Sequence, residues 1–279
     1  MISMVIRFGV SFIQKLTGVT VVPTLALEYA TENWMRNGWL RINPPALSLI
    51  IVPILVYMIY ENKQKRRRYF FCLGVVLFYS MFIHGARSLI LYQLIEIVFL
   101  VLYKRKSTKT QMVVFAFLAI AGMILVNSEV GNAYINSFLP GGEFEGSTTG
   151  RLEAIGFYLA SIQENFWTGT GFLSFEERQF VGEIGYVAGT LEDVGVLYSV
   201  VQVGAGIIGF YLMFLFRNIY IARRIKHNNE KSNSYLLVAG ITLSVFLTTI
   251  NIDMFYGIYV LAVPFGLAIC EFVSKQYAN

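Results

Sequence analysis

Long apolar runs, separated by short charged linkers, dominate the pattern of this chain. A membrane-spanning helix needs about 20 mainly apolar residues, with roughly 17 tolerated. Helices pair all their backbone groups internally, which makes them the arrangement that lipid favours. The pattern therefore predicts an all-α, polytopic membrane helix bundle. Seven runs are candidate transmembrane helices: 44–60, 69–84, 88–103, 111–127, 194–216, 233–250 and 252–272. The last two meet at 251–253, which leaves room only for a tight hairpin.

Charge in the linkers predicts how the bundle is oriented. Linkers 61–68, 104–110 and 217–232 each carry a net charge of +4, and they fall on one side if every run spans once. Basic linkers face the cytoplasm. The segment 128–193, which has ten acidic and two basic residues, is then a large loop on the outer face.

The N-terminal segment and the spans before and after this loop complete the predicted organisation. Charged residues interrupt the apolar stretches of 1–43, which we interpret as an outer-face or interfacial segment. An odd number of spans after such a segment leads us to expect further spans upstream of it. The chain thus has four parts, namely 1–43, a four-span region 44–127, the loop 128–193 and a three-span region 194–279.

The outer loop has structure of its own in this prediction. Glycine and serine residues mark 140–150 as a flexible approach. From 151 to 165 the apolar residues recur at helical spacing, which predicts a short amphipathic helix capped by the preceding threonines. Those residues are Leu152, Ile155, Tyr158, Leu159 and Ile162. A glycine-rich turn with aromatic residues follows at 167–172.

Composition supports a membrane protein. Hydrophobic residues make up 56% of the chain and charged residues only 14%, against about 25% charged in soluble domains. The net charge of +5 is spread over the linkers, so it does not indicate a nucleic-acid partner. Cys72 and Cys270 lie in apolar runs and are interpreted as packing residues. The sequence contains no recognisable cofactor or metal-binding motif.

Two arginines on the predicted outer side are candidates for anion binding. Arg87 stands at the outer end of a helical hairpin, and His84 lies three residues before it on the same helical face. Arg151 is one of two bases in the acidic loop; the other is Arg178. Arginine makes bidentate hydrogen bonds to phosphate oxygens. The alternatives are that Arg87 extends to lipid headgroups and that Arg151 forms an ion pair with a nearby glutamate.

Three acidic residues have competing interpretations. Glu192 and Asp193 precede the fifth span, where one of them is a candidate general base, since like charges raise a pKa. They equally suit a solvated helix N-terminus, where acids are favourable. Glu96 lies half a turn away from Arg87 on one helix, so we expect it to pack inside the bundle instead.

Several short motifs together resemble the O-antigen polymerase and ligase family. They cover residues 36–216 in the order that the family shows. They are RNGWLRINPP at 36–45, the turn GARS at 85–88, TGRL at 149–152, NFWTGTGF at 165–172 and LEDVGVL at 191–197. The family places an Asn-Pro at the start of the fourth motif, where this chain has Phe166. Many ligases of the family carry a histidine before the last motif. The outer loop here has none, which favours the polymerase branch.

This resemblance implies an inverting glycosyl transfer between polyprenyl-diphosphate-linked oligosaccharides on the outer face of a bacterial cytoplasmic membrane. It implies no cofactor and no metal. Other polysaccharide assembly proteins are expected partners beside the lipid bilayer. Arg87 and Arg151 are expected to stabilise the diphosphate, and Glu192 or Asp193 to act as base. The expected substrate contacts also include His84, Trp167, Gly169, Gly171 and Arg178.

Two other functions remain open at this point. A ligase would transfer the glycan to another acceptor, and the missing histidine counts against it. A flippase or other transporter would need polar residues deep in several spans. Charge within the runs is nearly confined to Glu96, which counts against transport.

Overall fold

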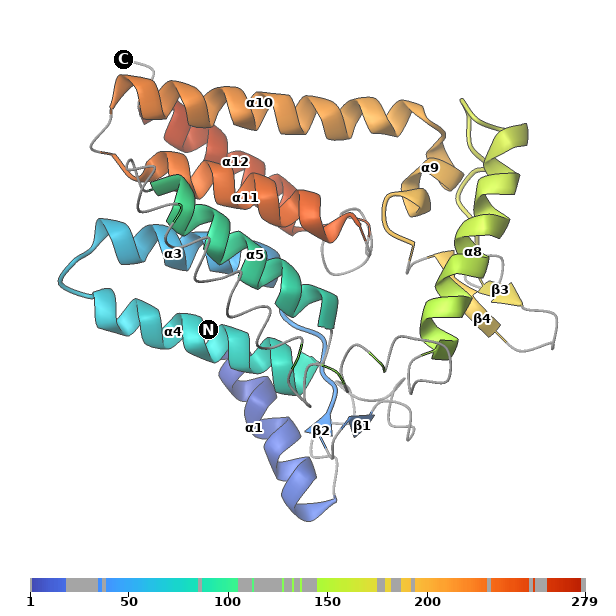
Figure 1. The fold of residues 1–279 in the computed structure, drawn as a ribbon, viewed down its shortest axis with the longest axis horizontal. Coiled ribbons are helices and arrows are strands. Elements are labelled where there is room, and N and C mark those ends of the chain that lie inside the picture. The colour runs from blue at the N-terminus through green and yellow to red at the C-terminus, as the bar shows by residue number, and fades with distance from the viewer. Residues whose placement is uncertain are drawn as a thin grey trace. The chain divides into compact units, whose positions relative to one another are not determined.

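The computed structural model shows a mostly helical chain that divides into two compact units. The first unit comprises residues 1–100, 217–247 and 257–279, and the second comprises 101–216 and 248–256. Figure 1 shows the elements, with the segments that are not described in grey. The described residues are 2–18, 35–36, 39–84, 87–104, 112, 127, 132, 136, 145–174, 179–181, 187–191, 194–229, 232–250, 253 and 260–276.

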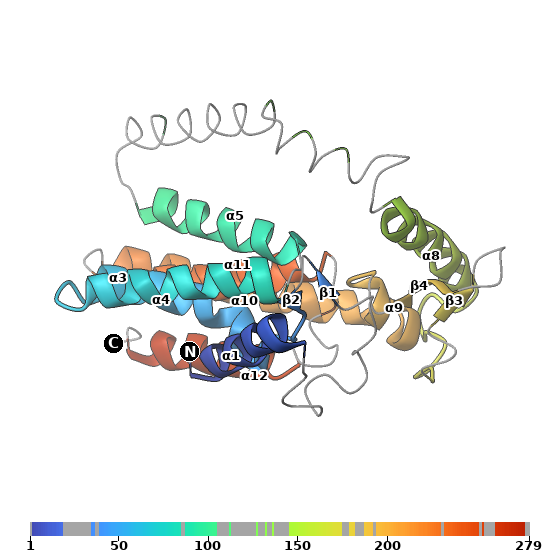
Figure 2. The ribbon, with the colours of Figure 1, turned by 90° about the horizontal axis from the view of Figure 1, so that it is seen from below.

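The first unit is built from helices that match several of the predicted apolar runs. Figures 1 and 2 show α3, α4, α5 and α11 running beside one another. Its elements are α1 (Ile2–Thr17), the hairpin of β1 (Met35–Arg36) with β2 (Trp39–Leu40), the 3-10 helix η2 (Ala46–Ile50), α3 (Ile51–Glu61), α4 (Arg66–Phe78), the π-helical turn η3 (Tyr79–His84), most of α5 (Arg87–Lys104), α11 (Ser234–Thr248) and α12 (Ala262–Gln276). Helices were expected at the first, second, third and sixth runs, and this is confirmed. The fourth run falls almost wholly outside the described residues.

The second unit contains the described part of the predicted outer loop. It consists of α8 (Glu145–Glu164), the antiparallel hairpin of β3 (Gln179–Val181) with β4 (Val187–Thr190), α9 (Leu197–Val203) and the first half of α10 (Gly206–Asn228). Within the described residues, strands occur only in these two short hairpins. The remaining regular elements of the described residues are helical, as the all-α prediction expects.

The fifth apolar run differs from the prediction. It was expected to be one helix over 194–216, but the structure breaks it into α9 and α10. Gly204 lies at the break with φ +89°, a left-handed conformation that ends helices and favours glycine. α10 then continues to Asn228, so most of the predicted linker 217–232 is helical.

The hairpin predicted at 251–253 lies largely outside the described residues. α11 ends at Thr248 and α12 begins only at Ala262. Asp253 lies between them, outside a helix and fully buried.

One helix within the described residues, Gly206–Asn228, is long and apolar enough to cross a membrane by length and composition. Leu47–Glu61 and Ser234–Thr248 are apolar but shorter. Arg217, near the middle of α10, pairs with Glu271 of α12 at 2.9 and 3.1 Å. These bidentate bonds neutralise a charge in the middle of α10.

Three helices of the first unit meet at Gly240 of α11. A Cβ atom on Gly240 would lie 2.5 Å from Cβ of Pro53, 3.0 Å from Cδ1 of Leu100 and 3.4 Å from Oε1 of Glu96. The Glu96 side chain is only 2% exposed, and Ser244 of α11 lies beside its carboxyl group. The expectation that Glu96 packs inside the bundle is therefore confirmed.

The contact at Gly240 gives a first prediction. Gly240→Ala adds a methyl group where Pro53 leaves no room, and overpacking of this kind costs about 1–3 kcal/mol. In a Cys72→Ser background, the buried thiol of Cys270 should react with a maleimide dye at a lower temperature in the Gly240→Ala protein. Gly74→Ala is the matched control, because nothing lies within 4 Å of a Cβ there. Equal reaction temperatures for the two variants would contradict the close approach.

Candidate functional site

In the first unit, the structure brings together two of the motifs that carry the family resemblance. The segment 39–43, which begins with β2, lies against η3. The N–H of Ile42 in this segment donates to the carbonyl of Ile83 at 3.3 Å. The hydroxyl of Tyr79 donates to the carbonyl of Ile42 at 3.0 Å. The start of the first apolar run is thereby held against the end of η3, which lies three positions before Arg87 in the sequence.

Arg41 is a further cation at the end of η3, and no motif in the sequence pointed to it. Its Nε donates to the carbonyl of His84 at 2.9 Å. The His84 side chain is 5% exposed, so it is buried. Arg87 is the first residue of α5, and its side chain lies outside the described part of the chain. Arg41 and His84 are 43 positions apart, so no local pattern in the sequence could have paired them.

Arg7 of α1 contacts the same segment of the chain. It donates to the carbonyl of Asn43 and, at 3.4 Å, to the hydroxyl of Ser3. The hydroxyl of Ser11 donates to the carbonyl of Leu40 at 2.8 Å. Helix α1 therefore supplies polar groups that fix the strand, which explains why this helix is not uniformly apolar.

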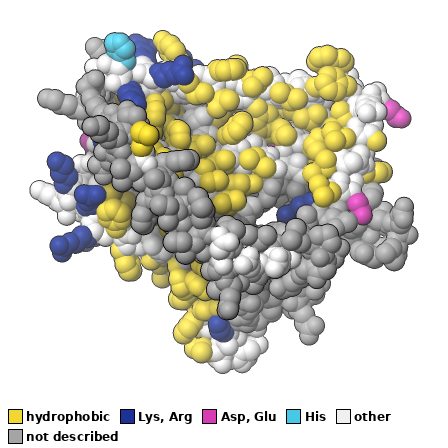
Figure 3. All heavy atoms as spheres, viewed as in Figure 1, with side chains coloured by type: hydrophobic (Ala, Val, Ile, Leu, Met, Phe, Trp, Pro, Cys, Tyr) yellow, Lys and Arg dark blue, Asp and Glu magenta, His cyan; other side chains and the backbone are white. Residues whose placement is uncertain are grey.

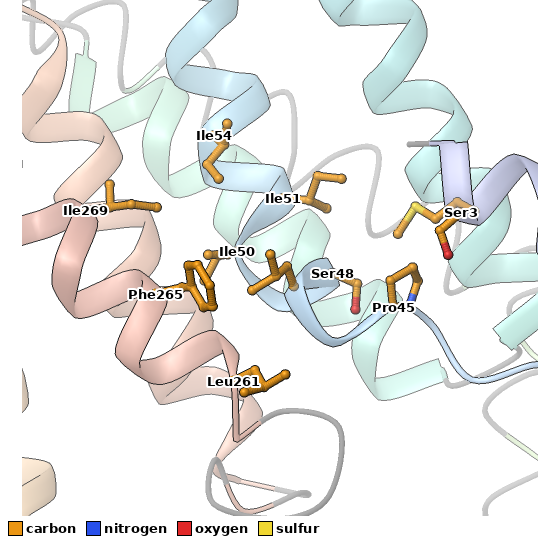
Figure 4. A pocket seen from close by; sticks show the side chains of 11 residues that line it. Ser3, Pro45, Ser48, Ile50, Ile51, Ile54, Leu261, Phe265 and Ile269 are labelled. Atoms are coloured by element: carbon orange, nitrogen blue, oxygen red, sulfur yellow. The ribbon is translucent and has the colours of Figure 1, made fainter.

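An apolar cavity of about 580 Å³ opens next to this strand. Figure 4 shows isoleucines of η2 and α3, Phe265 and Ile269 of α12, and Ser48 around it. The hydroxyl of Ser48 is buried and has no hydrogen-bond partner within the described residues. A cavity with this lining suits a hydrocarbon group rather than a polar ligand.

In the second unit, α8 packs on α9 through one narrow stripe. Ala154, Tyr158 and Ile162 are buried there with Val200 and Val201. The predicted apolar face was only partly right, because Leu152 and Leu159 are 65% and 48% exposed. Residues 154, 158 and 162 recur every four positions, and the small Ala154 allows close approach at the end of that row.

The start of α8 also differs from the prediction. The helix begins at Glu145, so the threonines that were expected to cap it lie inside it. Part of the approach at 140–150 that was predicted to be flexible is therefore helical. Arg151 lies in the second turn of the helix, away from the orphan N–H groups at its start.

Arg151 is half-buried on α8. Its Nε is shielded from solvent and donates no hydrogen bond to a described residue. No ion pair joins it to a described carboxylate, so the glutamate pairing considered for it is not found among these residues. Arg178, Glu192 and Asp193 lie outside the described residues.

The segment Asn165–Leu173, which we call the glycine turn, binds to the break between α9 and α10 through its backbone. Three N–H groups cross between the two segments: Ala205 to Phe166 at 2.8 Å, Thr170 to Val201 at 2.8 Å and Gly171 to Gln202 at 3.1 Å. Gly169 has φ +69°, and a Cβ there would lie 2.5 Å from the Gln202 backbone. A Cβ on Gly204 would lie 2.2 Å from the Trp167 carbonyl oxygen. Gly169 and Gly204 thus let two backbones touch.

A second backbone contact fixes the residues that lead into α9. The N–H of Val196 donates to the carbonyl of Thr249 at 2.9 Å. Gly195 has φ +60°, and a Cβ there would lie 2.2 Å from the same oxygen. Nearby in sequence, the buried Asp253 accepts a hydrogen bond of 2.7 Å from the Tyr211 hydroxyl. The described residues next to Glu192 and Asp193 are therefore rigidly held.

The residues that the structure describes contain no group of three or more metal-ligating side chains. In comparisons with known proteins, no family model and no curated protein matched the sequence. Function is therefore inferred from the residues themselves and from the motif resemblance.

The backbone contact of the glycine turn gives a second prediction. Gly204→Ala places a methyl group against the Trp167 carbonyl and forces alanine into a left-handed conformation, which together should cost about 2–4 kcal/mol. Limited proteolysis should then cleave within 165–173 faster than in the parent chain. Gly209→Ala, in the exposed part of α10 where nothing meets an added Cβ, should leave cleavage unchanged. Equal protection in the Gly204→Ala and Gly209→Ala proteins would show that the contact does not hold the turn.

Proposed function

We propose that this chain is a multi-pass protein of the bacterial cytoplasmic membrane with about seven transmembrane helices. It polymerises polyprenyl-diphosphate-linked oligosaccharide repeat units by inverting glycosyl transfer on the outer face. The observation that supports this most directly is the packing of the outer-loop motifs in the second unit. There, the helix with Arg151 and the glycine turn both pack on residues 194–205. The last three motifs of the resemblance therefore lie in one compact unit.

Charge in the first unit supports the proposed topology. The side chain of Asn233, which precedes α11, donates to Glu61 at the end of α3 at 3.0 Å. The linkers 61–68 and 217–232 therefore meet at one end of that unit. Figures 1 and 2 show α5 ending on the same side. Two basic linkers at one end, with α5 ending on that side, match the arrangement that places that side in the cytoplasm.

The proposed reaction transfers a sugar chain between two lipid carriers. A hydroxyl oxygen of one lipid-linked repeat unit attacks the anomeric carbon of another chain, and the bond from that carbon to the diphosphate breaks. The hydroxyl proton passes to a base, for which Glu192 and Asp193 are the candidates, and the lipid diphosphate leaves with the electron pair. Negative charge grows on the leaving group, so fixed cations lower the barrier. Arg87 and Arg151 are proposed for this role.

Two features of the first unit fit such a substrate. The Arg41 guanidinium is anchored at the turn before Arg87, so it adds positive charge where a diphosphate would be neutralised. The cavity beside the same strand is lined mainly by aliphatic side chains and suits part of an isoprenoid chain. A ligase with the same substrate but a different acceptor is the alternative that these features also allow. A flippase is disfavoured, because Glu96 is packed against Gly240.

The proposed topology predicts where reporter fusions will be active. Fusions at Asn62, Lys106 and Asn228 should report the cytoplasm, because they lie in or beside the basic linkers. Fusions at Gly142 and Gly182 should report the outer side. Paired alkaline phosphatase and fluorescent protein fusions at each site provide the measurement. A cytoplasmic signal from Gly142 would place the proposed chemistry on the wrong side and overturn the proposal.

The proposed chemistry predicts the effect of replacing the two arginines. Arg87→Ala and Arg151→Ala should each reduce polymer by about 10²–10³-fold at unchanged protein abundance, a loss typical of removing one group that stabilises transition-state charge. Lysine should restore little, because it lacks the bidentate fork. Gel analysis of glycans from a complemented deletion strain measures this, with the exposed Arg223 replaced by alanine as control. Single repeat units retained without long chains indicate a polymerase.

The same gel distinguishes the alternatives. Long chains that form but do not reach a surface acceptor indicate a ligase, and lipid-linked units retained in the cytoplasm indicate a flippase. Full-length polymer from the Arg151→Ala protein would remove Arg151 from the proposed mechanism and favour the ion-pair interpretation.

A further inference from the structure

The glycine turn lies at the start of the one described helix that is long and apolar enough to cross a membrane. Ala205, whose N–H binds the Phe166 carbonyl at 2.8 Å, directly precedes α10. Thr170 and Gly171 bind Val201 and Gln202, just before it. The turn is therefore fixed at this end of α10 by backbone hydrogen bonds, which side-chain motion does not release.

Aromatic side chains project from this fixed turn. Phe172 is 89% exposed, Trp167 is 76% exposed and Phe166 is 46% exposed. The rings of Phe166 and Trp167 form an edge contact with centroids 5.0 Å apart. Such large apolar side chains, gathered on a rigid turn, mark an interaction surface.

The length of α10 sets the level at which this surface lies. At 1.5 Å per residue, the distance from Gly206 to Arg223 along the helix is about 25 Å. Arg217 lies between them, and its charge is paired with Glu271 of α12. Arg223, Arg224 and Lys226 lie at the other end of α10, and Figure 3 shows Lys and Arg at that end with hydrophobic side chains along the helix. A hydrocarbon core is about 30 Å thick. If the basic end marks one interface, the glycine turn lies at the other.

We infer that Trp167 and Phe172 insert into the lipid interface of the outer leaflet and anchor the second unit to the bilayer. Tryptophan is enriched at this level, because its ring is apolar and its N–H can still reach water or headgroups. The inference rests on the proposed membrane topology. It assigns Trp167, which the sequence analysis placed in the substrate site, to lipid contact instead.

Stacking on a sugar ring is the other use for exposed aromatics, and the structure favours it less. A sugar site needs polar groups beside the ring to bind hydroxyls. Two polar groups that lie at the described turn are used internally. The Thr170 hydroxyl donates to the Val201 carbonyl at 3.0 Å, and the Gln202 Oε1 accepts from the Leu173 N–H at 3.3 Å.

Tryptophan fluorescence of the full chain in phospholipid nanodiscs tests the inference. The chain has three tryptophans, so Trp34→Phe with Trp39→Phe leaves Trp167 as the only reporter. Its emission should be blue-shifted, resist acrylamide and lose more intensity with shallow than with deep nitroxide-labelled lipids. Phe172→Ser in this background should shift the emission toward the red, whereas Thr168→Ala, a small change at an exposed position, should not.

Two results would overturn the inference, and they have different consequences. A chain that resists alkaline extraction from membranes but has an acrylamide-accessible Trp167, unquenched by either lipid, would exclude the anchor alone and leave the aromatics for a sugar ring. A chain released by alkaline extraction would overturn both the anchor and the proposed membrane bundle. Because the fluorescence assay needs no turnover, loss of polymerase activity has no bearing on it.

Discussion

The second unit depends on a backbone contact that leaves no space for a Cβ atom. Gly204 ends α9 in a left-handed conformation and lies against the Trp167 carbonyl. Any other residue at position 204 would have a strained backbone in the left-handed conformation, and its Cβ would overlap the Trp167 carbonyl. A helix that continued through position 204 would avoid both. The apolar run would then pass straight through, and the glycine turn would lose its hydrogen-bond partners at 201–205. One glycine therefore determines where α10 begins and where the turn is held.

The helices could be predicted because the hydropathy of each apolar run is a local property of the sequence. α3, α4, α5 and α11 were expected from local hydropathy, and the burial of Glu96 was expected from a carboxylate within such a run. The break at Gly204 could not be found in this way. Glycine among small and apolar residues is common in membrane helices, and what makes Gly204 left-handed is a turn more than 30 positions earlier in the chain.

The candidate site shows the same division between local and distant information. Arg151 and the glycine turn were recognised from short motifs. Arg41 was missed, because only the docking of β2 on η3 brings it to His84. The threonines before Arg151 fitted a helix cap, yet α8 begins earlier, at Glu145. Residue preference identifies a good cap, but tertiary packing decides whether the helix ends there.

In the proposed reaction, this rigidity has a chemical use. Both substrates are lipid-linked, so their diphosphates lie close to the membrane surface, and a cation helps only if it is held at that level. A mobile loop would lose conformational entropy each time it ordered Arg151 over a diphosphate. Here the glycine turn is hydrogen-bonded to the start of α10 and α8 packs on α9. The conformational entropy is therefore lost once, during folding, rather than each time a substrate binds. Positioning of this kind is a large part of what an enzyme contributes when two bound substrates must meet. In the proposed mechanism, the contribution of Gly169 and Gly204 is to keep the arginine-bearing unit in place.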